Sequence, residues 1–117
     1  MGQAMREDGK IDYVEMPGGD MAELKSFYAA AFGWSFTDYG PDYAAYNEGV
    51  DGGFDGDAAT RMTKPLVVLY ATDLEAMAAR VAAAGGTIVK PIFSFPGGRR
   101  FHFTDPSGNE LAAWSDK

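Results

Sequence analysis

The chain repeats one segment, and this repeat constrains the fold more than any other feature of the sequence. Residues 20–36 (DMAELKSFYAAAFGWSF) align without a gap with residues 73–89 (DLEAMAARVAAAGGTIV), at a constant offset of 53 residues. Each copy begins with Asp, continues with apolar residues at helical spacing and reaches Gly near its end, which is the pattern of a capped helix. Strand-like sequence flanks both helices, so the chain predicts two tandem βαβββ modules. A duplicated module forms a pocket along its own pseudo-symmetry axis, and we expect the functional site there.

The expected elements place both modules in one domain. We expect strands over residues 11–16, 34–39, 43–47 and 50–54 in the first module, and over residues 66–72, 87–93, 100–104 and 110–114 in the second. Within the domain of residues 11–117, module one spans residues 11–56, a polar connector spans residues 57–64 and module two spans residues 65–115. Residues 1–10 are polar, and we expect them to be flexible.

Length and composition limit what the protein does. A chain of 117 residues with 46% hydrophobic content makes one globular domain. The net charge of −7 argues against nucleic acids and anionic membranes as partners, because both need clustered Lys and Arg. The sequence has no cysteine and no long apolar run. Thiolate chemistry is therefore excluded, and we expect a cytoplasmic protein.

Helical and strand periodicity predicts which side chains face the helices. The layer between helices and sheets should contain Phe27, Phe32, Met77, Val81, Phe101 and Phe103. Neighbouring strand positions point to the opposite, concave face. That face is expected to carry Tyr13, Glu15, Val67, Leu69, Arg100, His102, Glu110 and Trp114. The set mixes apolar walls with a few polar groups, as sites for small-molecule ligands do.

Three motifs are typical of one known superfamily: D-x3-L-x2-FY-x3-FGW over residues 20–34, AAAGG over residues 82–86, and DPSGN over residues 105–109. With them the chain resembles the vicinal oxygen chelate superfamily, which includes glyoxalase I, extradiol dioxygenases and the bleomycin- and fosfomycin-resistance proteins. The resemblance covers residues 11–115. It implies the α+β glyoxalase/bleomycin-resistance fold, in which curved mixed or antiparallel sheets surround a central cleft. It does not imply one activity, because the superfamily carries many chemistries on one scaffold.

The resemblance also implies positions for a divalent metal, which members of the superfamily hold with His, Glu or Gln. In this chain those positions are occupied by Tyr13, Val67, Ala112 and, in the strand over residues 50–54, Asp51. Three of the four cannot bind a metal in the usual way, because coordination needs several converging nitrogen or oxygen ligands. We therefore expect no metal and no other cofactor.

Two ionisable side chains of the expected concave face are candidates for acid–base catalysis. His102 titrates near neutrality, and Glu15 would be its carboxylate counterpart. Both also have structural interpretations, His102 as a half-exposed strand residue with a hydrogen-bonded ring, and Glu15 as an ion-pair partner of Arg100 or a solvent-facing residue. Tyr13 and Trp114 are interpreted either as packing residues or as aromatic walls for a planar ligand.

Three functions stay open at this point. The first is a metal-independent isomerase or lyase that binds a small organic molecule and uses His102 and Glu15. The second is a protein that binds or sequesters a small molecule without chemistry, as the bleomycin-resistance members do. The third is a structural or regulatory subunit whose cavity is vestigial.

We also expect a homodimer. Superfamily members of this length usually pair, as the resemblance implies. Aromatic side chains that supply apolar surface for pairing are Trp34, Phe36, Tyr39, Phe93 and Phe95.

Overall fold

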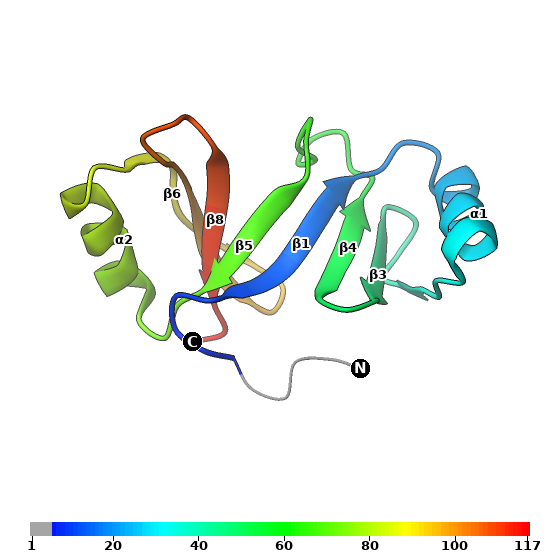
Figure 1. Ribbon diagram of the computed structural model, residues 1–117, viewed down its shortest axis with the longest axis horizontal. Coiled ribbons are helices and arrows are strands. Elements are labelled where there is room, and N and C mark those ends of the chain that lie inside the picture. The colour runs from blue at the N-terminus through cyan, green and yellow to red at the C-terminus, as the bar shows by residue number, and fades with distance from the viewer. Residues whose placement is uncertain (1–5) are drawn as a thin grey trace. The chain divides into compact units, whose positions relative to one another are not determined.

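The computed structural model describes residues 6–117, and its elements confirm an α+β chain of two βαβββ modules. In chain order (Figure 1) the elements are β1 (Ile11–Pro17), α1 (Met21–Phe32), β2 (Thr37–Asp38), β3 (Tyr43–Asn47), β4 (Asp51–Asp55), β5 (Leu66–Tyr70), α2 (Leu74–Ala83), β6 (Thr87–Phe95), β7 (Gly98–Thr104) and β8 (Glu110–Ser115). The described residues form two compact units. Unit one comprises residues 13–66, and unit two comprises residues 67–117 together with residues 6–12. Within the described residues, neither helix is long and apolar enough to cross a membrane.

Unit one contains four strands in the order β2-β3-β4-β1. β1 and β4 run parallel, whereas β3 pairs antiparallel with both β4 and β2. α1 begins after Asp20, whose carboxylate accepts a hydrogen bond of 3.0 Å from the backbone N–H of Glu23. The helix ends at Gly33, which adopts a left-handed φ of 74° that favours glycine.

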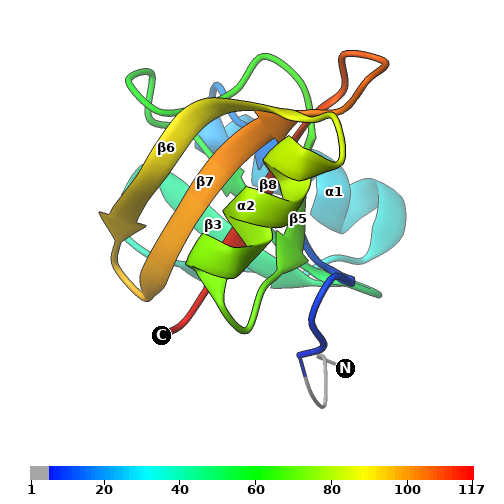
Figure 2. The same ribbon diagram turned by 90° about the vertical axis from the view of Figure 1, so that its left-hand side faces the viewer.

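Unit two repeats this plan with four strands in the order β5-β8-β7-β6. β5 and β8 run parallel, and β7 pairs antiparallel with both β8 and β6. Figure 2 shows the long β6–β7 hairpin with α2 beside it. α2 begins after Asp73, whose carboxylate accepts a 3.0 Å hydrogen bond from the backbone N–H of Ala76. Asp20 and Asp73 therefore have the same capping role, as the repeat predicted.

The core of unit two lies against α2. Its buried members are Ala71, Leu74, Met77, Phe101, Phe103 and Ala113, and the side chains packed against them are Leu69, Ala78, Val81, Ile88, Ile92 and Leu111. The expected positions of Met77, Val81, Phe101 and Phe103 in this layer are confirmed. Because side chains alternate along β7, His102 lies on the opposite face of the sheet.

The core of unit one is aromatic. The rings of Tyr28, Trp34, Phe36, Tyr46 and Phe54 lie against one another, with centroids 4.7 to 6.4 Å apart. Phe54 is 1% exposed and Tyr46 is 7% exposed. Aromatic pairs at these distances stabilise a core beyond the area that they bury.

α1 contributes Tyr28 to this cluster, but the expected packing of its other two rings is wrong. Phe27 is 55% exposed and Phe32 is 63% exposed, and no residue of α1 is fully buried. The reason lies in Trp34, which follows the helix. Its ring stacks on Tyr28 at 4.7 Å and lies 4.9 Å from Tyr46, so it occupies space that helix side chains would otherwise fill.

The segment before β1 is held by unit two. The N–H of Gly9 donates to the carbonyl of Tyr70 (2.8 Å), and the carboxylate of Asp8 accepts from the N–H and hydroxyl of Thr72 (2.9 and 3.0 Å). Residues 8–9 therefore have defined hydrogen-bond partners, while the flexibility expected of residues 1–10 stays a prediction. Residues 1–5 lie outside the described residues.

The two cores predict unequal costs for removing a phenylalanine ring. Phe103→Ala should lower the free energy of unfolding by about 3–5 kcal/mol, because the buried ring leaves a cavity against α2. Phe32→Ala should lower it by less than about 1 kcal/mol, because that ring is largely in solvent. Urea unfolding followed by circular dichroism measures both values, and equal losses would contradict the assigned faces.

Candidate functional site

The residues predicted for the concave face divide between the two units. Tyr13 and Glu15 belong to unit one. The other six, Val67, Leu69, Arg100, His102, Glu110 and Trp114, belong to unit two. Each unit brings part of its own set together. In each unit, several polar and aromatic side chains cluster around one ionisable side chain, and we call each such cluster a polar group.

In unit one, the polar group centres on Glu15, which is 8% exposed. The hydroxyl of Tyr43 donates to Oε2 of Glu15 (3.0 Å) and shares a short hydrogen bond with the hydroxyl of Tyr13. Burial, together with the charge of Glu15, raises the pKa of Tyr43 well above its usual value. Tyr43 is therefore protonated at neutral pH and holds the carboxylate of Glu15 in place.

The side chain of Tyr43 reaches Glu15 across β4, because β4 has glycine without a side chain at the position that the tyrosine ring covers. A Cβ added to Gly53 would lie 2.4 Å from the Tyr43 hydroxyl, and one added to Gly52 would lie 2.5 Å from the ring of Tyr46. Consecutive glycines thus allow one tyrosine ring to lie on each face of the strand. Sequence reasoning missed Tyr43. The available signal was the Gly-Gly pair inside a strand pattern, which marks a close approach of other atoms.

In unit two, the polar group centres on His102, whose side chain is 0% exposed. Its Nδ1 lies 3.0 Å from Oε2 of Glu110, which the neighbouring strand β8 supplies. The ring of Phe93 lies against the imidazole at 5.8 Å between centroids. Nε2 of His102 is buried and has no hydrogen-bond partner among residues 6–117. A buried polar atom of this kind is unusual and marks a position where a partner would be stabilising.

The protonation state of His102 follows from its surroundings. Burial lowers the pKa of His102, while the hydrogen bond to Glu110 acts in the opposite direction. Since a carboxylate only accepts hydrogen bonds, the neutral imidazole carries its proton on Nδ1. The lone pair of Nε2 is then available to accept a proton.

Two other predicted site residues of unit two, Arg100 on β7 and Trp114 on β8, contact aromatic rings and a buried carboxylate. The guanidinium of Arg100 lies 5.4 Å from the ring centroid of Phe93 and 5.6 Å from that of Phe95. Trp114 donates its indole N–H to Asp12 (2.9 Å), a buried carboxylate of the same unit. Trp114 therefore has a clear structural role, which is one of the two interpretations that its sequence position allowed.

On β5 the predicted site residues Val67 and Leu69 face α2 and not the concave side of the sheet. Leu69 packs against the α2 core, and Val67 shares that face by alternation. Val68 instead lies opposite Ala112, the residue paired with His102. The expected facing of Val67 and Leu69 is thus wrong by one residue. The reason is that the sequence LVVLY is apolar throughout and contains no alternation from which to read a register.

The positions implied for a metal do not form a ligand set. They carry Tyr13, Val67, Ala112 and Asp51, of which Val67 and Ala112 have no ligating atom in their side chains. Within the part of the chain that the structure describes, no three His, Asp or Glu side chains are placed to hold a metal ion. The donor atoms present therefore do not fit the group that the fold implies.

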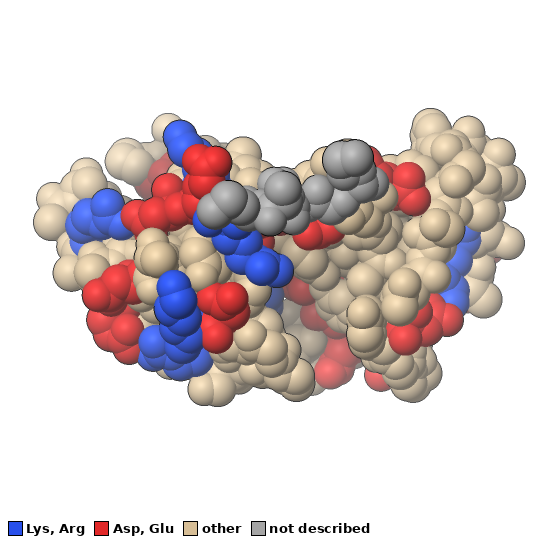
Figure 3. Space-filling view, turned by 90° about the horizontal axis from the view of Figure 1, so that it is seen from below, with Lys and Arg blue, Asp and Glu red and all other residues tan. Residues whose placement is uncertain are grey.

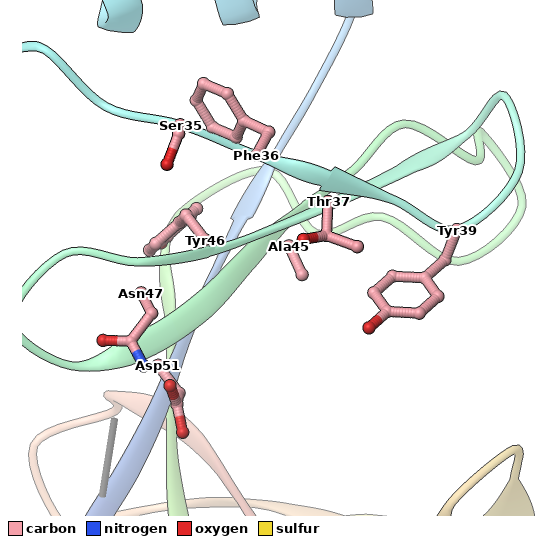
Figure 4. Close-up of a pocket in the computed structure, with 8 residues that line it drawn as sticks. All are labelled: Ser35, Phe36, Thr37, Tyr39, Ala45, Tyr46, Asn47 and Asp51. Carbon is pink, nitrogen blue, oxygen red and sulfur yellow. The ribbon is translucent and has the colours of Figure 1, made fainter. Parts of the chain in front are cut away.

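Unit one also contains a hollow of about 280 Å³ that the sequence did not predict. It is lined by Ser35, Phe36, Thr37, Tyr39, Ala45, Tyr46, Asn47 and Asp51. Figure 4 shows the side chains of Thr37, Tyr39, Asn47 and Asp51 on the same side of the strands as Ala45. The pairing agrees, because Thr37 lies opposite Ala45 and Asn47 lies opposite Asp51.

Comparison with known proteins identifies the scaffold. The family model of the Glyoxalase/Bleomycin resistance protein/Dioxygenase superfamily matches residues 10–113. No curated protein matches the chain. Among solved structures, an NAD-dependent benzaldehyde dehydrogenase from Legionella pneumophila superimposes with a TM-score of 0.74 at 13% identity, over 90% of this chain and 98% of the other.

Two further structures carry different names on the same fold. A Mn(II)-bound glyoxalase from Novosphingobium aromaticivorans has a TM-score of 0.65 at 23% identity, covering 96% of this chain but 40% of its own. A methylmalonyl-CoA epimerase from Mycobacterium tuberculosis has a TM-score of 0.65 at 14% identity, covering 97% of this chain and 91% of its own. At these identities the likeness shows the fold alone.

The lowered pKa of His102 predicts a stability that depends on pH. Below about pH 6.5 the unfolded chain takes up a proton on its histidine that the folded chain does not, so stability falls as pH falls through this value and is fully present above it. Urea unfolding at about pH 7.5 and about pH 5.5 should show a larger loss for the wild type than for His102→Asn. Because the chain has one histidine, the difference isolates this group. An equal or smaller loss in the wild type would contradict the assignment.

Proposed function

We propose that this chain, which belongs to the Glyoxalase/Bleomycin resistance protein/Dioxygenase superfamily, binds a small organic molecule and uses His102 to accept a proton from it. The observation that supports the proposal is the hydrogen bonding of the His102 imidazole, which leaves one ring nitrogen without a partner among the described residues. Glu110 fixes the proton on Nδ1, while Nε2 has no hydrogen-bond partner among residues 6–117. A neutral, oriented imidazole with a free lone pair is what general base catalysis requires.

The chemistry that suits this arrangement is proton transfer from carbon. Nε2 of His102 would take the proton of a C–H bond beside a carbonyl group, and the electron pair would move into the carbonyl. Return of the proton to another carbon gives an isomerase, whereas loss of a leaving group gives a lyase. Glu110 would stabilise the imidazolium that forms between the two steps, because the carboxylate accepts its Nδ1–H bond.

Glu15 is the second acid–base candidate, and Tyr43 supports that role in unit one. The Tyr43 hydroxyl donates to one carboxylate oxygen, which fixes the orientation of the side chain. The proposed reaction uses no metal, since the positions at which the superfamily holds one carry Tyr13, Val67 and Ala112.

A non-catalytic small-molecule-binding protein is the second candidate function, and the burial of His102 favours it. The side chain is 0% exposed, and a general base must come within about 2.6–3.2 Å of the proton it removes. If no substrate carbon reaches Nε2, the same polar group would serve only to bind and orient a ligand.

The proposal predicts a reaction that depends on His102 and not on metal. Wild-type protein in D2O should incorporate deuterium beside the carbonyl of a molecule found in a screen of small carbonyl compounds. His102→Gln should lower that rate by roughly 10²–10⁴-fold, the usual contribution of a general base, and EDTA should leave it unchanged. Because there is one histidine, its imidazole proton resonances report binding at this site.

The outcomes of this screen separate the candidates. Binding that shifts the His102 resonances without deuterium exchange supports the second candidate. Exchange that EDTA abolishes contradicts the metal-independent proposal. A screen in which no compound shifts those resonances contradicts both candidates and favours a structural or regulatory subunit.

We further propose that the protein is a homodimer. The support within unit one is apolar surface in solvent on α1, since Phe27 and Phe32 are 55% and 63% exposed. We expect light scattering at micromolar concentration to give twice the mass of one chain. A single-chain mass would contradict this.

A further inference from the structure

The hollow in unit one is lined in part by polar side chains, none of which is basic. Three strands contribute to it, with Thr37 from β2, Ala45 and Asn47 from β3, and Asp51 from β4. Its polar side chains offer a carboxylate, an amide and hydroxyl groups, and no Lys, Arg or His lines it. Carboxylates accept hydrogen bonds but never donate them, so the hollow suits a ligand that brings its own donors.

Asp51 supplies the one charged group of the lining. Its carboxylate makes no hydrogen bond and no ion pair with any residue from 6 to 117 that the structure records. Two other acidic side chains near the hollow are engaged: Asp38 pairs with Lys25 (2.9 Å), and Glu48 accepts from the N–H of Ser35 (3.1 Å). Asp51 is partly buried, and a carboxylate partly shielded from water gains more from a neighbouring cation than a fully exposed one does.

The charge of the chain is concentrated in the same unit. Residues 13–66 contain nine acidic and three basic side chains, a net charge of −6, whereas the whole chain carries −7. Acidic and basic side chains are nearly balanced in unit two, and Figure 3 shows them side by side on the surface of this unit. Of the three cations in unit one, Lys25 pairs with Asp38 and Arg61 donates to the carbonyl of Gly18 (2.6 Å).

We infer that this hollow binds the protonated primary amine of a small hydroxylated molecule. An ammonium group has three N–H donors, which Asp51, the amide oxygen of Asn47 and a hydroxyl of the lining can accept. The hydroxyl groups of the ligand would bond to Thr37 and Tyr39, and the negative field of unit one would raise the local concentration of cations. This site is separate from His102 and does not depend on the proposed reaction.

Matched pairs of amine and neutral molecules test the inference. The probes are glucosamine with glucose, and ethanolamine with ethylene glycol, each titrated at slightly acidic pH while amide chemical shifts are recorded by NMR. At least one amine should bind at least tenfold more tightly than its neutral partner, and its shifts should centre on Thr37, Asn47 and Asp51. The preference should weaken as salt is added, because exposed charges are screened.

Variants locate the binding. Asp51→Asn should weaken the amine at least tenfold, the usual loss for a hydrogen bond to a charged group. Asp42→Asn, an exposed acidic residue of the same unit, should leave it within about twofold. Thr37→Lys places a cation on exposed strand β2 and should abolish binding even if the Asp51 variant fails to fold. His102→Gln should have no effect, which separates this site from the proposed catalytic one.

Four results would overturn the inference. They are equal binding of amines and neutral partners, no detectable binding of either amine, shifts centred away from the hollow, and an Asp51→Asn variant that folds and binds as the wild type does.

Discussion

One parallel strand pairing closes each module of this chain. In unit one the strand before the helix, β1, pairs with the last strand, β4, and in unit two β5 pairs with β8 in the same way. The other pairings within each unit join antiparallel strands that are consecutive in the chain. The parallel pairing requires a long connection, which in each unit consists of a helix and two antiparallel strands, because parallel strands cannot be joined by a tight turn. It also fixes which residues of the first strand lie beside which residues of the last.

Both closing strands use small residues at their centre, with different consequences. β4 has Gly52 and Gly53, over which the rings of Tyr46 and Tyr43 lie on opposite faces. β8 has Ala112 and Ala113, both fully buried, which pair with His102 and Phe101. Small side chains at these positions leave volume for large ones on the neighbouring strand. The polar groups around Glu15 and His102 therefore both depend on a lack of bulk in the last strand of their module.

The sequence predicted the modules, the helix caps and one strand register correctly because each left a local pattern. Asp20 and Asp73 precede apolar residues at helical spacing, and Phe101 and Phe103 alternate with polar residues. Where the pattern was absent, prediction failed. The wholly apolar β5 gave no register, so Leu69 was assigned to the wrong face.

Other features depend on residues that only the fold brings together. Tyr43 approaches Glu15 across an intervening strand, and the Gly-Gly pair of that strand indicates a close approach without showing which two residues meet there. Periodicity placed Phe27 and Phe32 in the core, but it could not show that Trp34 would fill the space beneath the helix. The hollow beside Asp51 needs three strands in register, and alternation along one strand cannot reveal it.

The segment before unit one has a consequence for the order of folding. Asp12 belongs to unit two, where it accepts the indole hydrogen bond of Trp114 across 102 residues of chain. Contacts of such separation form late, because a long loop must close before they contribute. Residues 13–66 of unit one form one contiguous stretch that leaves the ribosome before Trp114 does, so the strands of this stretch can pair during synthesis. The start of β1, which contains Asp12, is therefore synthesised before unit one but reaches its partner in unit two only after Trp114 has been made.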